Sequence, residues 1–86
     1  MSVEVEIYTT PICPYCARAK ALLDKKGVSY TEIDVMRDRA RRREMEERSN
    51  GHTVPQIFIA GKAIGGCDDM FDLDFDGELD KMLGLK

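Results

Sequence analysis

Two cysteines three residues apart, Cys13 and Cys16, are the residues of this chain best suited to covalent chemistry. Pro14 lies between them, and proline suits the first turn of a helix, where its missing N–H would be unpaired in any case. Residues three apart on a helical turn are neighbours, close enough for the two sulfur atoms to reach disulfide geometry. The unpaired N–H groups of that turn carry partial positive charge, which favours a thiolate. The spacing therefore predicts a pair that alternates between dithiol and disulfide.

The residues around this pair place it where a strand passes into a helix. Before the pair, apolar and polar residues alternate over residues 3–8, the pattern of a half-buried strand. After it, an apolar stripe at helical spacing is formed by Tyr15, Ala19, Leu22 and Leu23. Gly27 is a natural end, so we expect this helix to reach about residue 26. Cys13 is thus expected at the tip of a helix, nearer to solvent than its partner.

Length and composition limit the class of protein. The 86 residues with a hydrophobic fraction of 43% predict a single domain, residues 1–86, with a modest core. No apolar run approaches a membrane span and no signal-peptide pattern is present, so we expect a cytoplasmic protein without a membrane partner. Three cysteines, an odd number, argue against a secreted disulfide scaffold. A net charge of −3, with arginines interspersed among glutamates, argues against nucleic acid as a partner.

The segment after the first helix predicts two further elements. Residues 28–35 are rich in β-branched and aromatic side chains and are expected to form a second strand. Strand, helix and strand in succession make a right-handed βαβ unit with parallel strands. From Met36 to about Ser49 we expect a charged helix with few apolar positions, which Asn50–Gly51 ends.

The last third of the chain predicts a hairpin and short helices. Gln56–Ala60 is a compact third strand, and a tight turn at Gly61–Lys62 leads into an antiparallel fourth strand, Ala63–Ile64. A short helix is expected from Cys67, and a last helical turn or two around Leu79. The order β-α-β-α-β-β-α predicts an α/β fold of the thioredoxin-like type, with a four-stranded mixed sheet and helices on both faces.

Three blocks of sequence resemble the bacterial class I dithiol glutaredoxins, and the resemblance extends over essentially the whole chain. The blocks are Cys13–Lys20, Thr53–Ile59 and Gly65–Asp69. A Cys-x-x-Cys pair alone is shared with zinc sites, whereas the three blocks in this order and at these separations are specific. The resemblance implies a glutathione-dependent thiol–disulfide oxidoreductase that reduces protein disulfides and glutathione mixed disulfides. It implies no metal and no tightly bound cofactor, with glutathione as the reductant.

The resemblance also assigns roles and partners. In this family the more N-terminal cysteine is the nucleophile, which implies that role for Cys13 and makes Cys16 the resolving thiol. The implied partners are glutathione and disulfide-containing or glutathionylated proteins of the ribonucleotide reductase type. A monomer is expected.

The second block resembles the loop whose proline is cis in thioredoxin-like folds. The family pattern implies a cis peptide bond between Val54 and Pro55, which turns the Val54 backbone toward the cysteines. Thr53, Val54 and Pro55 are then expected to bind glutathione, with the Val54 backbone pairing with the tripeptide as an added strand segment. The alternative is a proline that simply precedes an edge strand.

The third block is expected to bind an anion. The backbone around Gly66 and the N–H groups of Cys67 and Asp68 would hold the γ-glutamyl carboxylate, and Asp68 or Asp69 would accept from the ammonium group. The alternative is an aspartate that caps the helix without any ligand. Cys67 is either a thiol open to oxidation or a small buried side chain. Tyr15 is expected to flank the glutathione sulfur, or else to pack at the helix start.

The glycine carboxylate of glutathione needs a cation, and here the chain departs from the family. Many members have a lysine shortly before the cysteine pair, where this chain has Thr10. Arg42 is the candidate replacement in the second helix. The alternative for Arg42 is a solvent-facing ion pair with Glu46 one turn along.

Two other functions remain open from the sequence. A redoxin reduced by thioredoxin reductase would use the same dithiol without glutathione, and Thr10 is consistent with it. A carrier in which two chains bridge an iron–sulfur cluster through Cys13 and two glutathiones is the second. Pro14 argues against the carrier, because a proline after the nucleophile stiffens the site.

Overall fold

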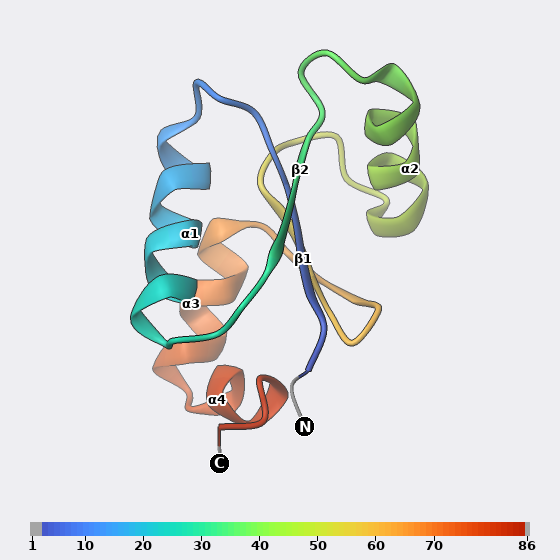
Figure 1. Ribbon diagram of the computed structural model, residues 1–86. Coiled ribbons are helices and arrows are strands. Elements are labelled where there is room, and N and C mark those ends of the chain that lie inside the picture. The colour runs from blue at the N-terminus through green and yellow to red at the C-terminus, as the bar shows by residue number, and fades with distance from the viewer. Residues whose placement is uncertain (1–2, 86) are drawn as a thin grey trace.

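The computed structural model describes residues 3–85 and is built around a four-stranded sheet with the strand order β2-β1-β3-β4 (Figure 1). The elements in chain order are β1 (Val5–Thr9), α1 (Pro14–Lys25), β2 (Thr31–Asp34), α2 (Arg39–Ser49), β3 (Gln56–Ile59), β4 (Lys62–Gly65), α3 (Cys67–Phe75) and α4 (Glu78–Met82). In residues 3–85, no helix is both long enough and apolar enough to cross a membrane.

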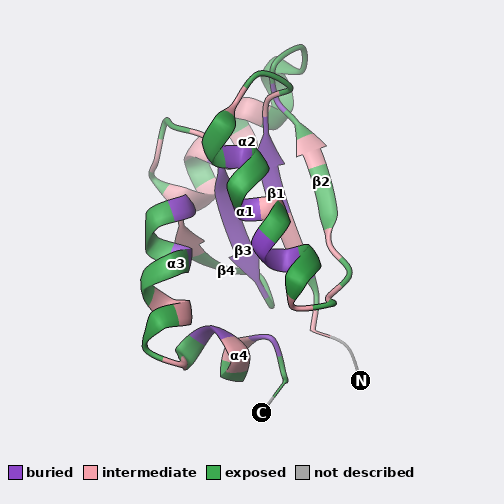
Figure 2. Ribbon diagram, turned by 90° about the vertical axis from the view of Figure 1, so that its left-hand side faces the viewer, coloured by how far each residue is buried: buried purple, intermediate pink, exposed green. Residues whose placement is uncertain are grey.

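The sheet is mixed and has helices on both faces, as predicted. β1 and β2 are parallel and joined through α1, whereas β3 is antiparallel to both β1 and β4. Figure 1 shows α1, α3 and α4 on one side of the sheet and α2 on the other. The central strands β1 and β3 are largely buried and the outer strands β2 and β4 are more exposed (Figure 2). The predicted thioredoxin-like fold is therefore confirmed.

The core has two parts because side chains alternate across the sheet. Ile57 and Ile59 point to the face that α1, α3 and α4 cover, where they join a cluster with Leu23 and Met70. Phe58 points to the other face. There it packs in a smaller cluster with Tyr8, Val35 and Met45.

Arg48 adds a polar anchor between α2 and the sheet. Its guanidinium lies 4.0 Å from the centre of the Phe58 ring and donates to the Tyr8 hydroxyl at 2.7 Å. It also donates to both carboxylate oxygens of Glu6, at 3.0 and 3.1 Å, and these bonds raise the pKa of Arg48 above its ordinary value. The C-terminal end of α2, and with it the loop before β3, is thereby fixed against the sheet.

β1 is Val5–Thr9 rather than residues 3–8, and three further boundaries differ from the prediction, each for a local reason. β2 begins at Thr31 rather than at residue 28, because the Val28 N–H closes the end of α1 by bonding to the Leu23 carbonyl at 3.3 Å. α2 begins at Arg39 rather than at Met36, because the Asp38 carboxylate caps it through the Arg41 N–H at 3.0 Å.

The third difference is the hairpin turn. It lies at Ala60–Gly61 rather than at Gly61–Lys62, so β4 begins with Lys62. Both turn residues have positive φ, 53° and 79°, as a two-residue hairpin turn with the right-handed strand twist requires.

Candidate active site

Cys13 occupies the N-cap position of α1, with Pro14 as the first helical residue. Its Sγ accepts a hydrogen bond from the Cys16 backbone N–H at 3.1 Å and lies 3.8 Å from the Val54 carbonyl oxygen. Both cysteines are free thiols. Cys13 is partly exposed, whereas Cys16 is only 1% exposed. The two sulfur atoms therefore differ in access although they share one helical turn.

Burial also changes the acidity of the Cys16 thiol. Burial first, and then the hydrogen bond with Cys13, raise the pKa of the Cys16 thiol to about 12. Cys16 is therefore protonated at neutral pH in the reduced protein. Lys20, one turn along α1, pairs with Glu32 on β2 at 2.9 Å.

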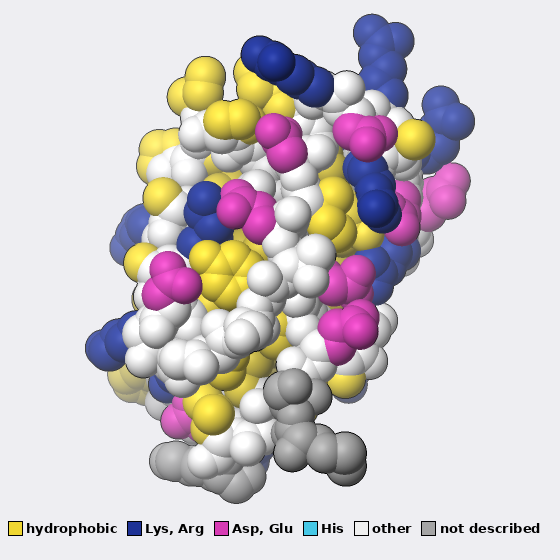
Figure 3. Space-filling view, viewed as in Figure 1, with side chains coloured by type: hydrophobic (Ala, Val, Ile, Leu, Met, Phe, Trp, Pro, Cys, Tyr) yellow, Lys and Arg dark blue, Asp and Glu magenta, His cyan; other side chains and the backbone are white. Residues whose placement is uncertain are grey.

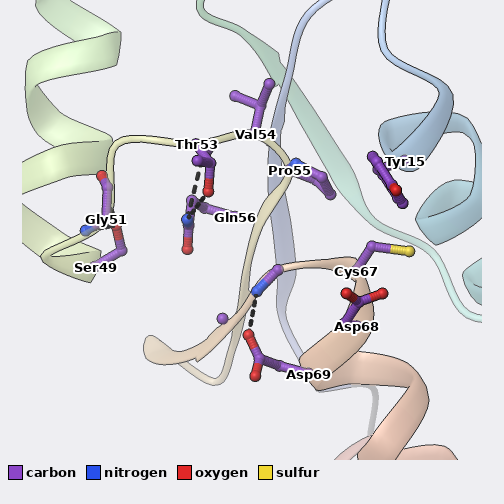
Figure 4. A pocket seen from close by; sticks show the side chains of 12 residues that line it. Tyr15, Ser49, Gly51, Thr53, Val54, Pro55, Gln56, Cys67, Asp68 and Asp69 are labelled. Atoms are coloured by element: carbon purple, nitrogen blue, oxygen red, sulfur yellow. Dashed lines mark hydrogen bonds between the residues drawn. The ribbon is translucent and has the colours of Figure 1, made fainter.

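A groove of about 500 Å³ is lined in part by Val54, whose carbonyl oxygen lies 3.8 Å from the Cys13 Sγ. Figure 4 shows the residues that line it. It is bounded by the end of α2, the loop before β3 and the start of α3, with Tyr15 of α1 on the far side. The peptide bond between Val54 and Pro55 is cis, as the family pattern implied. The lining residues are Tyr15, Ser49, Gly51, Thr53, Val54, Pro55, Gln56, Gly65, Gly66, Cys67, Asp68 and Asp69.

Two glycines allow the start of α3 to approach this loop. Gly65 has a φ of 106°, which favours glycine, and a Cβ there would collide with the Asp69 carboxylate. A Cβ on Gly66 would stand 3.2 Å from the Pro55 carbonyl oxygen. The second and third sequence blocks therefore meet in space at this point.

The two aspartates at the start of α3 have different surroundings. Both are exposed and line the groove, but only the Asp69 carboxylate caps the helix, by accepting from the Gly66 N–H at 2.9 Å. Cys67 and Asp68 are the first two helical residues, whose N–H groups have no carbonyl partner within the helix. Cys67 is buried, which raises the pKa of its thiol. Its sulfur extends toward the α1 side of the groove (Figure 4).

Of the residues predicted to bind glutathione, Arg42 is the one that does not line the groove. Its guanidinium donates to the His52 carbonyl at 2.7 Å and lies 3.9 Å from Glu46. Among the described residues that line the groove there is no lysine or arginine. Basic side chains gather instead over α2, on the upper right of Figure 3.

Four lining residues were not among the predicted site residues: Ser49, Gly51, Gln56 and Gly65. Gln56 and Gly65 lie within the blocks that resemble glutaredoxins, so proximity in sequence could have indicated them. Ser49 and Gly51 reach the groove only because α2 packs against the sheet. Nothing in their own sequence context marks them.

The described part of the chain offers no cluster of three or more His, Cys, Asp or Glu side chains able to hold a metal ion. The residues of this site that can do covalent chemistry are the free thiols of Cys13 and Cys16. The glutaredoxin family model matches residues 5–64, which include both cysteines and the cis proline.

The chain belongs to the glutaredoxin family. It is 57% identical to glutaredoxin 3 of Escherichia coli strain K12 over 79 residues, which cover 92% of this chain and 95% of that protein. Membership makes the chain a glutathione-dependent thiol–disulfide oxidoreductase, as the sequence resemblance implied.

Solved structures show the same fold. The buckwheat glutaredoxin–glutathione complex superposes with a TM-score of 0.88 at 33% identity, covering 95% of this chain and 77% of that one. The glutaredoxin of Brucella melitensis superposes with a TM-score of 0.85 at 52% identity, covering 98% of this chain and 91% of that one.

Proposed function

We propose that Cys13 is the nucleophile and Cys16 the resolving thiol of this oxidoreductase. The observation that supports the assignment is the asymmetry of the pair. Cys13 is the more accessible thiol and accepts the Cys16 N–H at the positive end of α1. Cys16 is buried, and its raised pKa keeps it protonated until a disulfide forms next to it.

The proposed reaction begins with a mixed disulfide of glutathione and a protein. The Cys13 thiolate forms a bond to the glutathione sulfur, the original S–S bond breaks, and the protein thiolate leaves and takes a proton from solvent. A second glutathione thiolate then attacks the sulfur of the bound glutathione, releasing glutathione disulfide and the Cys13 thiolate. With a protein disulfide, Cys13 bonds to one protein sulfur and the other protein sulfur leaves as a thiolate. Cys16 then loses its proton to solvent and attacks the Cys13 sulfur, so that a Cys13–Cys16 disulfide forms and the second protein thiolate leaves. Two glutathione molecules reduce this disulfide to the dithiol and become glutathione disulfide.

Glutathione would occupy the groove beside Cys13. We place its cysteine residue along the backbone of Thr53, Val54 and Pro55, with Tyr15 flanking the sulfur; the Cys13 Sγ lies 3.8 Å from the Val54 carbonyl oxygen. The buckwheat glutaredoxin solved with glutathione supports glutathione as the ligand of this fold.

The charged ends of glutathione would lie at the two ends of the groove. The γ-glutamyl carboxylate is assigned to the first turn of α3, at Gly66, Cys67 and Asp68, with Asp68 near the ammonium group and Asp69 holding the turn. Arg42 would attract the glycine carboxylate from outside the groove lining, with guanidinium N–H groups that the His52 carbonyl does not use.

The reductant, the protein substrates and the location of the protein in the cell are proposed from the same chemistry. Glutathione is the proposed reductant, with no tightly bound cofactor. The proposed substrates are disulfide-containing and glutathionylated proteins, including the ribonucleotide reductase type that the family resemblance implies. A cytoplasmic monomer fits a thiol pair that glutathione must keep reduced.

A coupled assay with glutathione, glutathione reductase and a glutathionylated peptide tests the assignment. The Cys13→Ser variant should be inactive, because serine cannot form the mixed disulfide. Cys16→Ser should retain reduction of the glutathionylated peptide and lose reduction of an intramolecular protein disulfide. Turnover by Cys13→Ser would refute the assignment. Reduction by thioredoxin reductase in place of glutathione would favour the other redoxin class.

A further inference from the structure

Gln56 is a polar residue at a position where the strand is otherwise apolar. It begins β3, is only 6% exposed, and is followed by three buried apolar residues, Ile57–Ile59. A buried carboxamide is costly unless it is hydrogen-bonded. The hydrogen bonds of the Gln56 carboxamide therefore indicate what this side chain contributes to the structure.

The Gln56 carboxamide ties the loop before the cis proline to its own strand. Its Nε2 donates to the Thr53 carbonyl at 3.0 Å and lies 3.4 Å from the Thr53 hydroxyl (Figure 4). The Thr53–Gln56 turn is thus closed by a side chain on the groove wall. Thr53 and Val54 are the residues whose backbone faces the proposed path of glutathione.

Gly51 supports the carboxamide from the other side. A Cβ built on Gly51 would lie 2.7 Å from the Gln56 Nε2, so only glycine leaves room for the amide in this place. Gly51 is itself held at the end of α2, since its N–H donates to the Ser49 hydroxyl at 3.0 Å. That hydroxyl donates to the Met45 carbonyl at 2.7 Å. A continuous set of contacts therefore runs from α2 through Gln56 to Thr53.

We propose that Gln56 is a positioning residue for glutathione: its carboxamide fixes Thr53, and with it the Val54 backbone against which the tripeptide lies. It acts through Thr53 and not on the reacting sulfur atoms. The proposal rests on the proposed function, because it concerns the same groove. Loss of the Gln56 carboxamide should therefore slow the reaction with disulfides that contain glutathione more than the reaction with other disulfides. A disulfide without glutathione does not contact the backbone of Thr53 and Val54.

The experiment compares two disulfides in single-turnover reactions with the reduced protein. One is a glutathionylated peptide and the other is 2-hydroxyethyl disulfide, which carries no glutathione. Gln56→Met removes the amide, and Gln56→Glu replaces its N–H donors with a carboxylate facing the Thr53 carbonyl. Both should lower the second-order rate constant with the peptide by about three- to tenfold, the range for one lost hydrogen bond. The rate with 2-hydroxyethyl disulfide should stay within about twofold.

Gly51→Ala provides an independent perturbation of the same amide. The added Cβ displaces the flexible end of the Gln56 side chain, so the rate with the peptide should fall as in Gln56→Met. Combined with Gln56→Met it should cause no further loss, because the amide is already gone. Ile57→Val is the control, a core change at the next residue that makes no contact with the amide of Gln56 and should leave the preference for glutathione unchanged.

Three results would overturn the proposal: no loss in the Gln56 variants, equal loss with both disulfides, or additive losses for Gly51 and Gln56. Failure of the underlying function is recognised separately. In that case the wild-type protein would itself react no faster with the glutathionylated peptide than with 2-hydroxyethyl disulfide.

Discussion

Asp68 and Asp69 are adjacent in the sequence and both are exposed, yet only one of their carboxylates caps the helix. Asp69 closes the first turn of α3 by accepting from the Gly66 N–H at 2.9 Å, and Asp68 lies at the edge of the groove. The sequence predicted an anion site for this block, with an aspartate cap at Asp68 as the alternative. The structure has the cap on Asp69, and the anion site stays a prediction.

This division predicts different effects for two alanine variants. Asp69→Ala should lower the free energy of unfolding by about 1 kcal/mol, as expected for a lost helix cap, and should also weaken glutathione binding because the turn loosens. Asp68→Ala should leave the unfolding free energy within about 0.5 kcal/mol and raise KM for the glutathionylated peptide. Urea unfolding and steady-state kinetics on both variants provide the check. Equal losses of stability would contradict the division.

The first residue of a helix can be predicted well only where the sequence itself fixes the first turn. α1 could be placed from Cys13 and Pro14 because proline fixes the first turn. α2 could not, because Met36 and Arg37 are good helix formers by composition. Only the local bonds of Asp34 and Asp38 keep these residues in a turn. Side chain–backbone bonds of this kind compete with helix formation in ways that periodicity does not reveal.

Elements α1 and β2 are linked by a polar cluster on the sheet edge. The Glu32 carboxylate accepts from Lys20 at 2.9 Å and from the Thr9 hydroxyl at 2.8 Å. The bond from Lys20 first, and then that from Thr9, hold the pKa of Glu32 below its ordinary value. A carboxyl group with a lowered pKa stabilises the fold above its ordinary pKa and loses that contribution as the pH falls through the lowered value.

We therefore expect Glu32→Gln to be less stable than the wild type at neutral pH, by less than about 1 kcal/mol because the pair is partly exposed. The difference should narrow as the pH falls below the ordinary pKa of a glutamate, about 4.3, and through the lowered pKa of Glu32. Urea unfolding at neutral pH and at acidic pH measures it. Glu47→Gln is the control, since within residues 3–85 no ion pair is formed by Glu47. A difference that does not change with pH would show that the charge of Glu32 is not the cause.

At the scale of the whole molecule, the sequence predicted the fold and the place of Cys13 and Cys16 at the start of a helix. It did not predict all the residues that line the groove. Alternating apolar residues and the cysteine spacing are local signals, whereas the groove forms where α2, β3 and α3 meet. The cis bond before Pro55 could be expected only from the family pattern, because most peptide bonds before proline are trans. Ser49 and Gly51 became recognisable only with the packing of α2 in place.

The role of Arg42 as the cation for glutathione stays a prediction, and the structure shows only where its guanidinium lies. Its place in the helix suggested a ligand contact, but its guanidinium is directed to the His52 carbonyl and lies outside the groove lining. The other arginines near the start of α2 are exposed, which agrees with the solvent-facing alternative. Because no lysine or arginine is among the described residues that line the groove, the proposed contact of Arg42 with the glycine carboxylate has to come from outside that lining.

The account depends on Cys13 being the reactive cysteine, with its sulfur at the N-terminus of α1 and accepting the Cys16 N–H, while the buried Cys16 stays protonated beneath it. Its most direct test is alkylation of the reduced protein by iodoacetamide at about pH 6, with each cysteine followed by peptide mass analysis and free glutathione as the reference thiol. Cys13 should react at least about tenfold faster than glutathione, because a helix N-terminus favours the thiolate, while Cys16 and Cys67 stay unmodified. A Cys13 that reacts no faster than glutathione in the folded protein would contradict the account.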